Sequence, residues 1–88
     1  MKLQKTNSKA DTKAKKLGII LKEAREKVGM SAEDMAFKTR LTRQQIYNYE
    51  SGKTNPTIEK ARQLCSDYKV NLQDTLEDAG YFDLDMNR

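Results

Sequence analysis

The stretch Thr42-Arg-Gln-Gln-Ile-Tyr-Asn-Tyr-Glu-Ser-Gly52 predicts one short helix with two different sides. Thr42 is a suitable N-cap, because its hydroxyl accepts a hydrogen bond from a backbone N–H that has no helical partner. Gly52 is a suitable stop, because glycine adopts the left-handed conformation without steric cost. Ile46 and Tyr49 lie three residues apart, so they share one side of the helix, which we expect to face a core.

The other side of this helix carries Arg43, Gln44, Tyr47 and Asn48. Arginine has donors that match guanine in the DNA major groove, and glutamine and asparagine match adenine. An ordinary solvated helix surface is the simpler explanation, but three such side chains on one side favour base reading. Two roles are compatible with Tyr47: contact with a thymine methyl or a phosphate, or shielding of the helix. The stretch therefore predicts a helix, residues 43–50, that reads double-stranded DNA.

The segment before this helix predicts a second helix joined to it by a short turn. Ser31-Ala-Glu-Asp34 resembles a capping box, with Asp in place of the usual Glu. The helix it opens is expected to run to about Thr39. The dipeptide Arg40-Leu41 then leads to the Thr42 cap, so the two helices form a helix-turn-helix unit.

Three further helices are expected around this unit. The first covers residues 17–27 and ends near Gly29; its apolar stripe has the spacing of an amphipathic helix and comprises Leu17, Ile20, Leu21, Ala24 and Val28. The fourth starts at Asn55-Pro56, with proline in the first helical position. Its stripe comprises Ile58, Ala61, Leu64, Cys65 and Tyr68. Asn71 caps a fifth helix over residues 72–79, which Gly80 ends. Phe37, Tyr49 and Tyr68 are expected in or at the edge of the core.

The composition of the 88 residues excludes several classes of function. The chain has no histidine and one cysteine, so a disulfide framework, the common zinc sites and a histidine-based triad are excluded. We expect no metal, no cofactor and no enzymatic activity. Cys65 is expected to be a small buried residue and suits a reducing cytoplasm. The sequence has no apolar run of membrane-spanning length and no secretory signal.

Charge is unevenly distributed along the chain. Residues 1–16 contain six lysines against one aspartate, whereas residues 54–88 contain four basic and seven acidic residues. An anionic partner would therefore meet the N-terminal part and the central helix. Residues 1–16 lack an apolar pattern and are expected to form a flexible arm. A DNA-binding arm and a solvated tail are both open for this segment.

The C-terminal residues 80–88 are expected to form a tail outside the helical domain of residues 17–79. In this tail, Tyr81-Phe-Asp-Leu-Asp-Met86 alternates apolar and acidic residues. A segment that folds back, a contact with a partner protein and a frayed end are all compatible with this pattern.

From Leu17 to Leu76 the sequence resembles the DNA-binding domain of the phage repressor and Cro family, also called XRE-type regulators. The matching residues are Leu21, Arg25, Gly29, Ser31, Met35, Ala36, Leu41, Thr42, Ile46, Glu50, Gly52, Pro56, Leu64, Val70 and Leu76. The resemblance implies an all-α, compact five-helix bundle of the lambda-repressor type. It places the helix of residues 43–50 in the major groove and the preceding helix across the DNA backbone.

The resemblance also implies roles for individual residues. Base contacts fall to Arg43, Gln44 and Asn48, with Tyr47 alongside. An internal ion pair is implied between Arg25 and Glu50. The loop after the helix of residues 43–50 lies along the sugar-phosphate backbone, and polar side chains near the unit suit such contacts. The candidates for backbone contact are Ser31, Lys38, Arg40, Thr42, Ser51, Lys53, Thr54 and Asn55.

Two positions depart from the family pattern. Many members have glutamine where this chain has Ala32, so the phosphate contact of that side chain is missing or comes from elsewhere. The turn between the two helices often has glycine where this chain has Arg40. A left-handed backbone there would cost about 1 kcal/mol.

These observations predict a sequence-specific regulator of transcription that acts as a repressor in the cytoplasm, on bacterial or phage DNA. One such domain reads few base pairs, so a homodimer on a palindromic operator is expected. The expected dimer surface is the fifth helix with the Tyr81–Met86 segment. The alternative is an antitoxin, or another protein-interaction module, that also regulates its own operon through a partner bound at the C-terminal tail.

Overall fold

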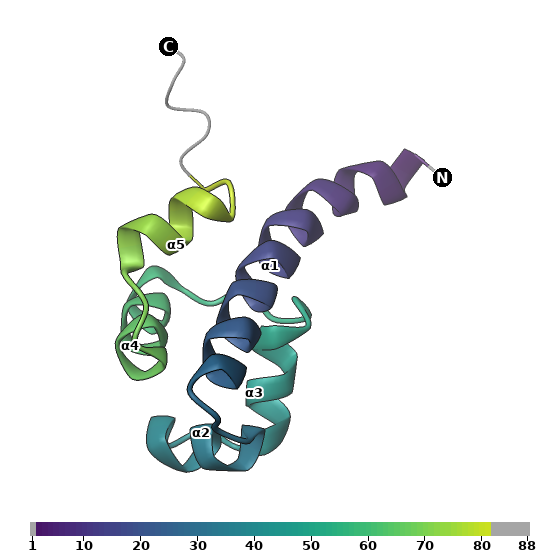
Figure 1. Cartoon of the computed structure of the whole chain (residues 1–88). Coiled ribbons are helices and arrows are strands. Elements are labelled where there is room, and N and C mark those ends of the chain that lie inside the picture. Colours follow the sequence, from purple (N-terminus) through teal and green to yellow (C-terminus); the bar gives the residue numbers. More distant parts are fainter. Residues whose placement is uncertain (1, 82–88) are drawn as a thin grey trace.

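The computed structural model describes residues 2–81 of the chain, and the side chains of residues 12–81. These residues form five α-helices. They are α1 (Lys2–Lys27), α2 (Ala32–Thr39), α3 (Arg43–Glu50), α4 (Ile58–Tyr68) and α5 (Leu72–Asp78). The long helix α1 contacts α3, α4 and α5, and α2 contacts α3 and α4 (Figure 1). The predicted all-α fold with a helix-turn-helix is confirmed.

The first helix is longer than expected. It begins at Lys2, not Leu17, so residues 2–16 are helical where a flexible arm was expected. This segment lacks an apolar stripe, but it contains no glycine or proline and is rich in lysine, a good helix former. Ala14, before the expected start of the domain, is buried, with 4% of its surface exposed. Figure 1 shows the first turns of α1 (purple) extending past the other helices.

The starts of α2 and α3 follow the predicted capping. The Ser31 hydroxyl accepts a hydrogen bond from the Asp34 backbone at 3.0 Å, and the Asp34 carboxylate accepts one from the Ser31 backbone at 3.2 Å. At α3, Thr42 and Gln45 form the same reciprocal pair, at 3.0 and 2.9 Å. Each pair satisfies two backbone donors that the helix leaves without partners.

The start of α4 differs from the prediction. Pro56 precedes the helix, and Thr57 is the N-cap, since its hydroxyl accepts from the Lys60 backbone at 3.1 Å. Ile58 is therefore the first residue of α4 and is 61% exposed, although the predicted stripe buried it. α5 begins after the predicted cap, Asn71.

The core lies between α1 and the other four helices. Its main cluster of buried residues comprises Leu17, Leu21, Ala32, Met35, Ala36, Ile46, Leu64, Tyr68 and Ala79. Ala14, Ala61, Cys65 and Leu76 are buried as well. Cys65 is buried, as expected. Val28 and Phe37 were expected to be buried but are 55% and 89% exposed. Val28 lies past the end of α1, and Phe37 lies two positions after Met35, which puts it on the opposite side of α2.

Arg40 adopts the left-handed conformation that the turn between α2 and α3 requires, with φ 63°. Its backbone N–H donates to the carbonyl oxygen of Phe37 at 3.3 Å, and the backbone N–H of Leu41 donates to the carbonyl oxygen of Ala36 at 2.9 Å. The turn therefore has the usual left-handed helix end, with arginine in the place that glycine prefers.

A glycine in α1 allows the backbone of α3 to approach closely. A Cβ added to Gly18 would lie 2.3 Å from the carbonyl oxygen of Glu50 and 2.6 Å from that of Tyr49. These are backbone atoms at the end of a helix, so they cannot move aside as a side chain does. The sequence pattern did not indicate this role, because Gly18 sits within the predicted first helix and not at a turn.

We therefore expect Gly18→Ala to destabilise the protein by about 1–3 kcal/mol, the usual cost of overpacking a tight contact. A mid-helix Gly→Ala change would otherwise be stabilising. The neighbouring, 53% exposed Ile19 provides the control, and Ile19→Ala should change stability by less than about 0.5 kcal/mol. Urea unfolding followed by circular dichroism measures both. A Gly18→Ala variant as stable as the parent chain would contradict this packing.

Candidate DNA-binding surface

The helix α3 is held on one side and open on the other. Ile46 is fully buried and Glu50 is 6% exposed, whereas Arg43, Gln44 and Tyr47 are exposed and Asn48 is partly exposed. We call Arg43, Gln44, Tyr47 and Asn48 the reading face. The structure thus brings all four predicted base-reading residues onto one side of one helix.

Two members of the reading face are bonded to each other. The Gln44 side-chain amide donates to the Asn48 side-chain oxygen at 3.0 Å. This bond leaves the side-chain oxygen of Gln44 and the amino group of Asn48 as the groups that a ligand can bind. The pair therefore offers an acceptor and donors from a fixed arrangement, which is the combination that adenine requires in the major groove.

The position of α3 is fixed by a buried ion pair. Arg25 donates through Nε and Nη2 to the two carboxylate oxygens of Glu50, each at 2.8 Å, which is the bidentate geometry that suits arginine. Arg25 also donates to the backbone oxygen of Met30 at 2.9 Å. The Tyr68 hydroxyl donates to Glu50 at 2.8 Å. The expected pair of Arg25 and Glu50 is therefore part of a network that joins α1, α3 and α4.

The network shifts two ionisation equilibria. The hydrogen bond to Glu50 raises the pKa of the Arg25 guanidinium. Burial, followed by the hydrogen bond to Glu50, raises the pKa of the Tyr68 phenol far above its usual value. Both groups therefore keep the protonated form that donates to Glu50. Every buried polar side-chain atom within the described part of the chain has a hydrogen-bond partner.

The loop after α3 presents polar side chains next to the reading face. The backbone N–H groups of Lys53 and Thr54 both bond to the carbonyl oxygen of Asn48, at 2.9 and 3.1 Å. The loop is thus tied to α3, and the side chains of Lys53, Thr54 and Asn55 are exposed. Asn55 has an unexpected partner, because its side-chain oxygen accepts a hydrogen bond from the Tyr81 hydroxyl at 2.7 Å.

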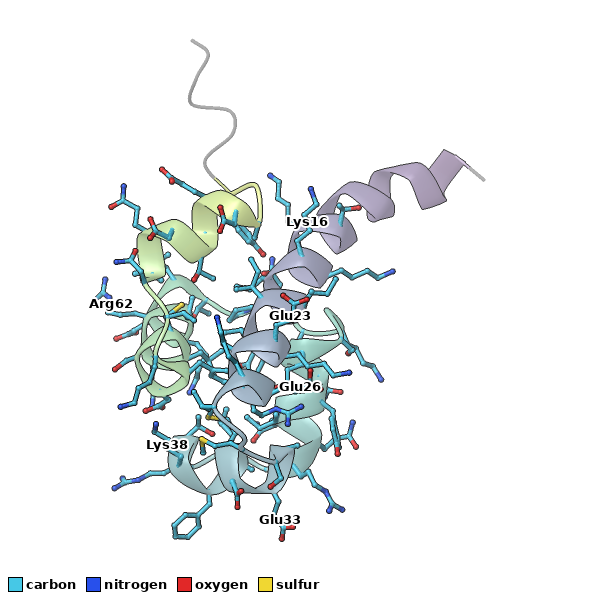
Figure 2. The ribbon with its side chains drawn as sticks, viewed as in Figure 1. Lys16, Glu23, Glu26, Glu33, Lys38 and Arg62 are labelled. Carbon is cyan, nitrogen blue, oxygen red and sulfur yellow. The ribbon has the colours of Figure 1, made fainter. Side chains whose placement is uncertain are left out.

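The other candidates for backbone contact lie in two places. Ser31 and Thr42 are exposed N-caps, so their hydroxyl oxygens are occupied while their hydroxyl hydrogens remain for a phosphate. Lys38 and Arg40 line a shallow hollow with Arg62 and other residues of α4. In Figure 2 the labelled Lys38 and Arg62 lie on the α4 side of the bundle. The structure therefore does not group Lys38 and Arg40 with the reading face.

Lys22 is a surface cation that the sequence pattern did not single out. It lines one hollow together with Gln44, Tyr47, Asn48 and Lys53. Lys22 precedes Arg25 by three residues on α1, so both project toward the same side, where Glu50 of α3 lies. The expected ion pair of Arg25 with Glu50 was thus the sequence signal for Lys22, because it places this side of α1 against α3.

We expect Arg25→Met to destabilise the protein by about 3–5 kcal/mol, because it leaves the Glu50 carboxylate buried without its cation. Adding Glu50→Gln should restore part of the loss, because the stranded charge is removed. The control is Arg62→Met, at an exposed position of α4, which should cost less than about 0.5 kcal/mol. Urea unfolding compares the variants, and equal costs for Arg25→Met and Arg62→Met would contradict the role of the pair.

The fold and the exposed side of α3 define a helix-turn-helix DNA-binding domain. Residues 21–74 match the helix-turn-helix family HTH_3, which is more than half of the chain. The chain belongs to this helix-turn-helix family of DNA-binding transcriptional regulators. The resemblance to the phage repressor and Cro family is thereby confirmed.

Two known proteins resemble the chain, one in sequence and one in fold. The chain is 29% identical to the HTH-type transcriptional regulator DdrOP3 of Deinococcus deserti over 62 residues. These residues are 70% of this chain and 48% of that protein. The chain thus spans about half the length of this relative. It also resembles the crystal structure of the clp gene regulator ClgR from C. glutamicum, with a TM-score of 0.70 and 20% identity over 78% of this chain and 90% of that one. At this identity the likeness concerns the fold alone.

The described residues lack two other kinds of feature. None of the helices there is long and apolar enough to cross a membrane. Among the side chains of residues 12–81, no group of three or more His, Cys, Asp or Glu residues could hold a metal ion.

Proposed function

We propose that the chain is a sequence-specific repressor that binds a palindromic operator as a homodimer and covers a promoter. The observation that carries the proposal is the reading face. Arg43, Gln44 and Asn48 project from a short helix whose start is capped and whose end is held by the network of Glu50. Such a helix can enter the major groove as a rigid element. The protein would act in the cytoplasm, on bacterial or phage DNA.

Base reading would be divided among the three polar residues. Arg43 at the start of α3 would bind a guanine, and the bonded pair of Gln44 and Asn48 would bind an adenine. Tyr47 lies between them and would contact a thymine methyl or a phosphate. Lys53, Thr54, Asn55 and Lys22 would contact the backbone beside the reading face, and Ser31 and Thr42 would do so at the helix starts. Lys38 and Arg40, which line the hollow beside α4, are the remaining candidates for backbone contact.

Dimerisation would use α5 and the apolar residues of the groove beside it, without Asn55, which is left for the DNA backbone. This groove is mostly apolar, and its lining comprises Leu17, Asn55, Pro56, Ile58, Ala61, Leu76 and Tyr81. Ile58 is the exposed apolar residue at its edge. A second copy that covered this surface would present two α3 helices to one duplex, and a palindromic operator requires such helices on successive turns of DNA, about 34 Å apart. The name of DdrOP3, a transcriptional regulator, is in keeping with the proposal.

An antitoxin that also regulates its own operon was the alternative, and it depended on the Tyr81–Met86 segment. Tyr81 is described, and residues 82–88 lie outside the described residues. The reading face of α3 supports DNA binding, which the repressor and the autoregulating antitoxin share.

Base reading predicts that Gln44→Ala lowers affinity for the best duplex selected from a random pool by about 5- to 150-fold, the value of one base contact. Affinity for unselected duplex DNA should change little. Gln63→Ala, at an exposed position of α4, is the control and should alter neither affinity. Fluorescence anisotropy titrations give both constants. An equal loss on selected and unselected DNA would refute base reading by this helix.

The basic start of α1 predicts a second, sequence-independent contribution. Replacing Lys2, Lys5 and Lys9 by glutamine preserves helix propensity and removes three charges, whereas deletion of residues 1–16 would also remove the buried Ala14. If these lysines contact phosphates, the slope of log affinity against log salt should become shallower by about 0.9 for each phosphate that is no longer neutralised. Lys60→Gln on α4 is the control. A slope that matches the parent chain would leave this segment as a solvated helix end.

A further inference from the structure

We infer that Tyr81 is a positioning residue for DNA binding, because its hydroxyl holds the side-chain oxygen of Asn55 and turns the Asn55 amino group outward to a phosphate. The inference rests on the proposed function, since it takes Asn55 as a backbone contact. It adds a residue from the far end of the helical domain, which neither the family match over residues 21–74 nor the proposed contacts include.

The hydrogen bond determines which end of the Asn55 amide is free. The Tyr81 hydroxyl donates to the Asn55 oxygen at 2.7 Å, the usual distance for a well-formed O–H···O hydrogen bond. An amide has one oxygen that accepts and one nitrogen that donates two hydrogens. When the oxygen is occupied by a donor from the protein, the nitrogen is the group left for a ligand. A DNA phosphate offers only acceptors, so the free end is the one it needs.

Tyr81 is itself held in place by three kinds of contact. Its backbone N–H bonds to the carbonyl oxygen of Leu76 at 2.9 Å, in the turn that ends α5. Its ring packs against the hydrophobic core. The Lys13 ammonium lies 5.9 Å from the ring centroid, within the range of a cation–π contact. Burial also raises the pKa of the Tyr81 phenol, so the hydroxyl keeps its proton at neutral pH.

The bond to Tyr81 also anchors the loop after α3, which contains Asn55. Its first part is tied to α3 through the Asn48 carbonyl oxygen, which accepts from Lys53 and Thr54. Asn55 comes next and is exposed, and Pro56 after it has no backbone donor. The Tyr81 bond thus connects this exposed side chain to the end of α5. Through Tyr81, the loop is linked to both α5 and Lys13 of α1.

A double-mutant cycle of Tyr81→Phe and Asn55→Ala tests the inference, with labelled duplex DNA of mixed sequence as the probe. Tyr81→Phe keeps the ring and its contact with Lys13 and removes only the donor. We expect it to weaken binding about three- to tenfold, the value of one hydrogen bond. In the Asn55→Ala background the same change should have no further effect. The loss should be the same on a selected duplex, because a phosphate contact carries no sequence information.

The control is Tyr47→Phe, which removes a hydroxyl from the reading face and should have the same effect in both backgrounds. Equal losses from Tyr81→Phe with and without Asn55, or no loss in the parent chain, would overturn the role of Tyr81. The proposed function would stand in that case, provided that the parent chain binds duplex DNA. A parent chain that did not bind duplex DNA would overturn both. If Tyr81 acted on stability alone, Tyr81→Phe would lower the unfolding midpoint and leave the affinity of the folded protein for DNA unchanged.

Discussion

The buried contact between Arg25 and Glu50 is the constraint on which the rest of the domain depends. Glu50 is the last residue of α3, and its carboxylate accepts three hydrogen bonds, two from Arg25 and one from Tyr68. The backbone carbonyl of the same residue lies against Gly18 of α1. Side chain and main chain thus fix one end of α3, and the capping pair of Thr42 and Gln45 fixes the other. Because both ends of α3 are held, the direction of the reading face is fixed.

The parts of the fold that local chemistry determines could be predicted from the sequence. Ser31 and Thr42 are caps because their side chains and the residues three positions later bond within one turn. The bounds of α2 and α3 follow from them. The ion pair was expected only from the family resemblance, because Arg25 and Glu50 are 25 residues apart and no local pattern connects them.

Other features depend on distances that only the folded chain supplies. Gly18 matters because the end of α3 lies against it, and Tyr81 matters because Asn55 comes within 2.7 Å. Residues 2–16 lack apolar periodicity, which predicts a flexible arm, but their helix propensity agrees with the start of α1 at Lys2. Phe37 was assigned to the core by its hydrophobicity, whereas its position after Met35 directs it to solvent. Lys22 looked like part of a solvated helix surface until α3 was placed beside it.

The central claim is that the exposed side of α3 reads the sequence of duplex DNA. Repeated selection of bound duplexes from a random pool, followed by sequencing, tests it most directly. The account predicts an enriched palindrome whose half-sites are about one helical turn apart and contain guanine and adenine for Arg43, Gln44 and Asn48. A bound pool with the same base composition as the starting pool at every position would contradict it.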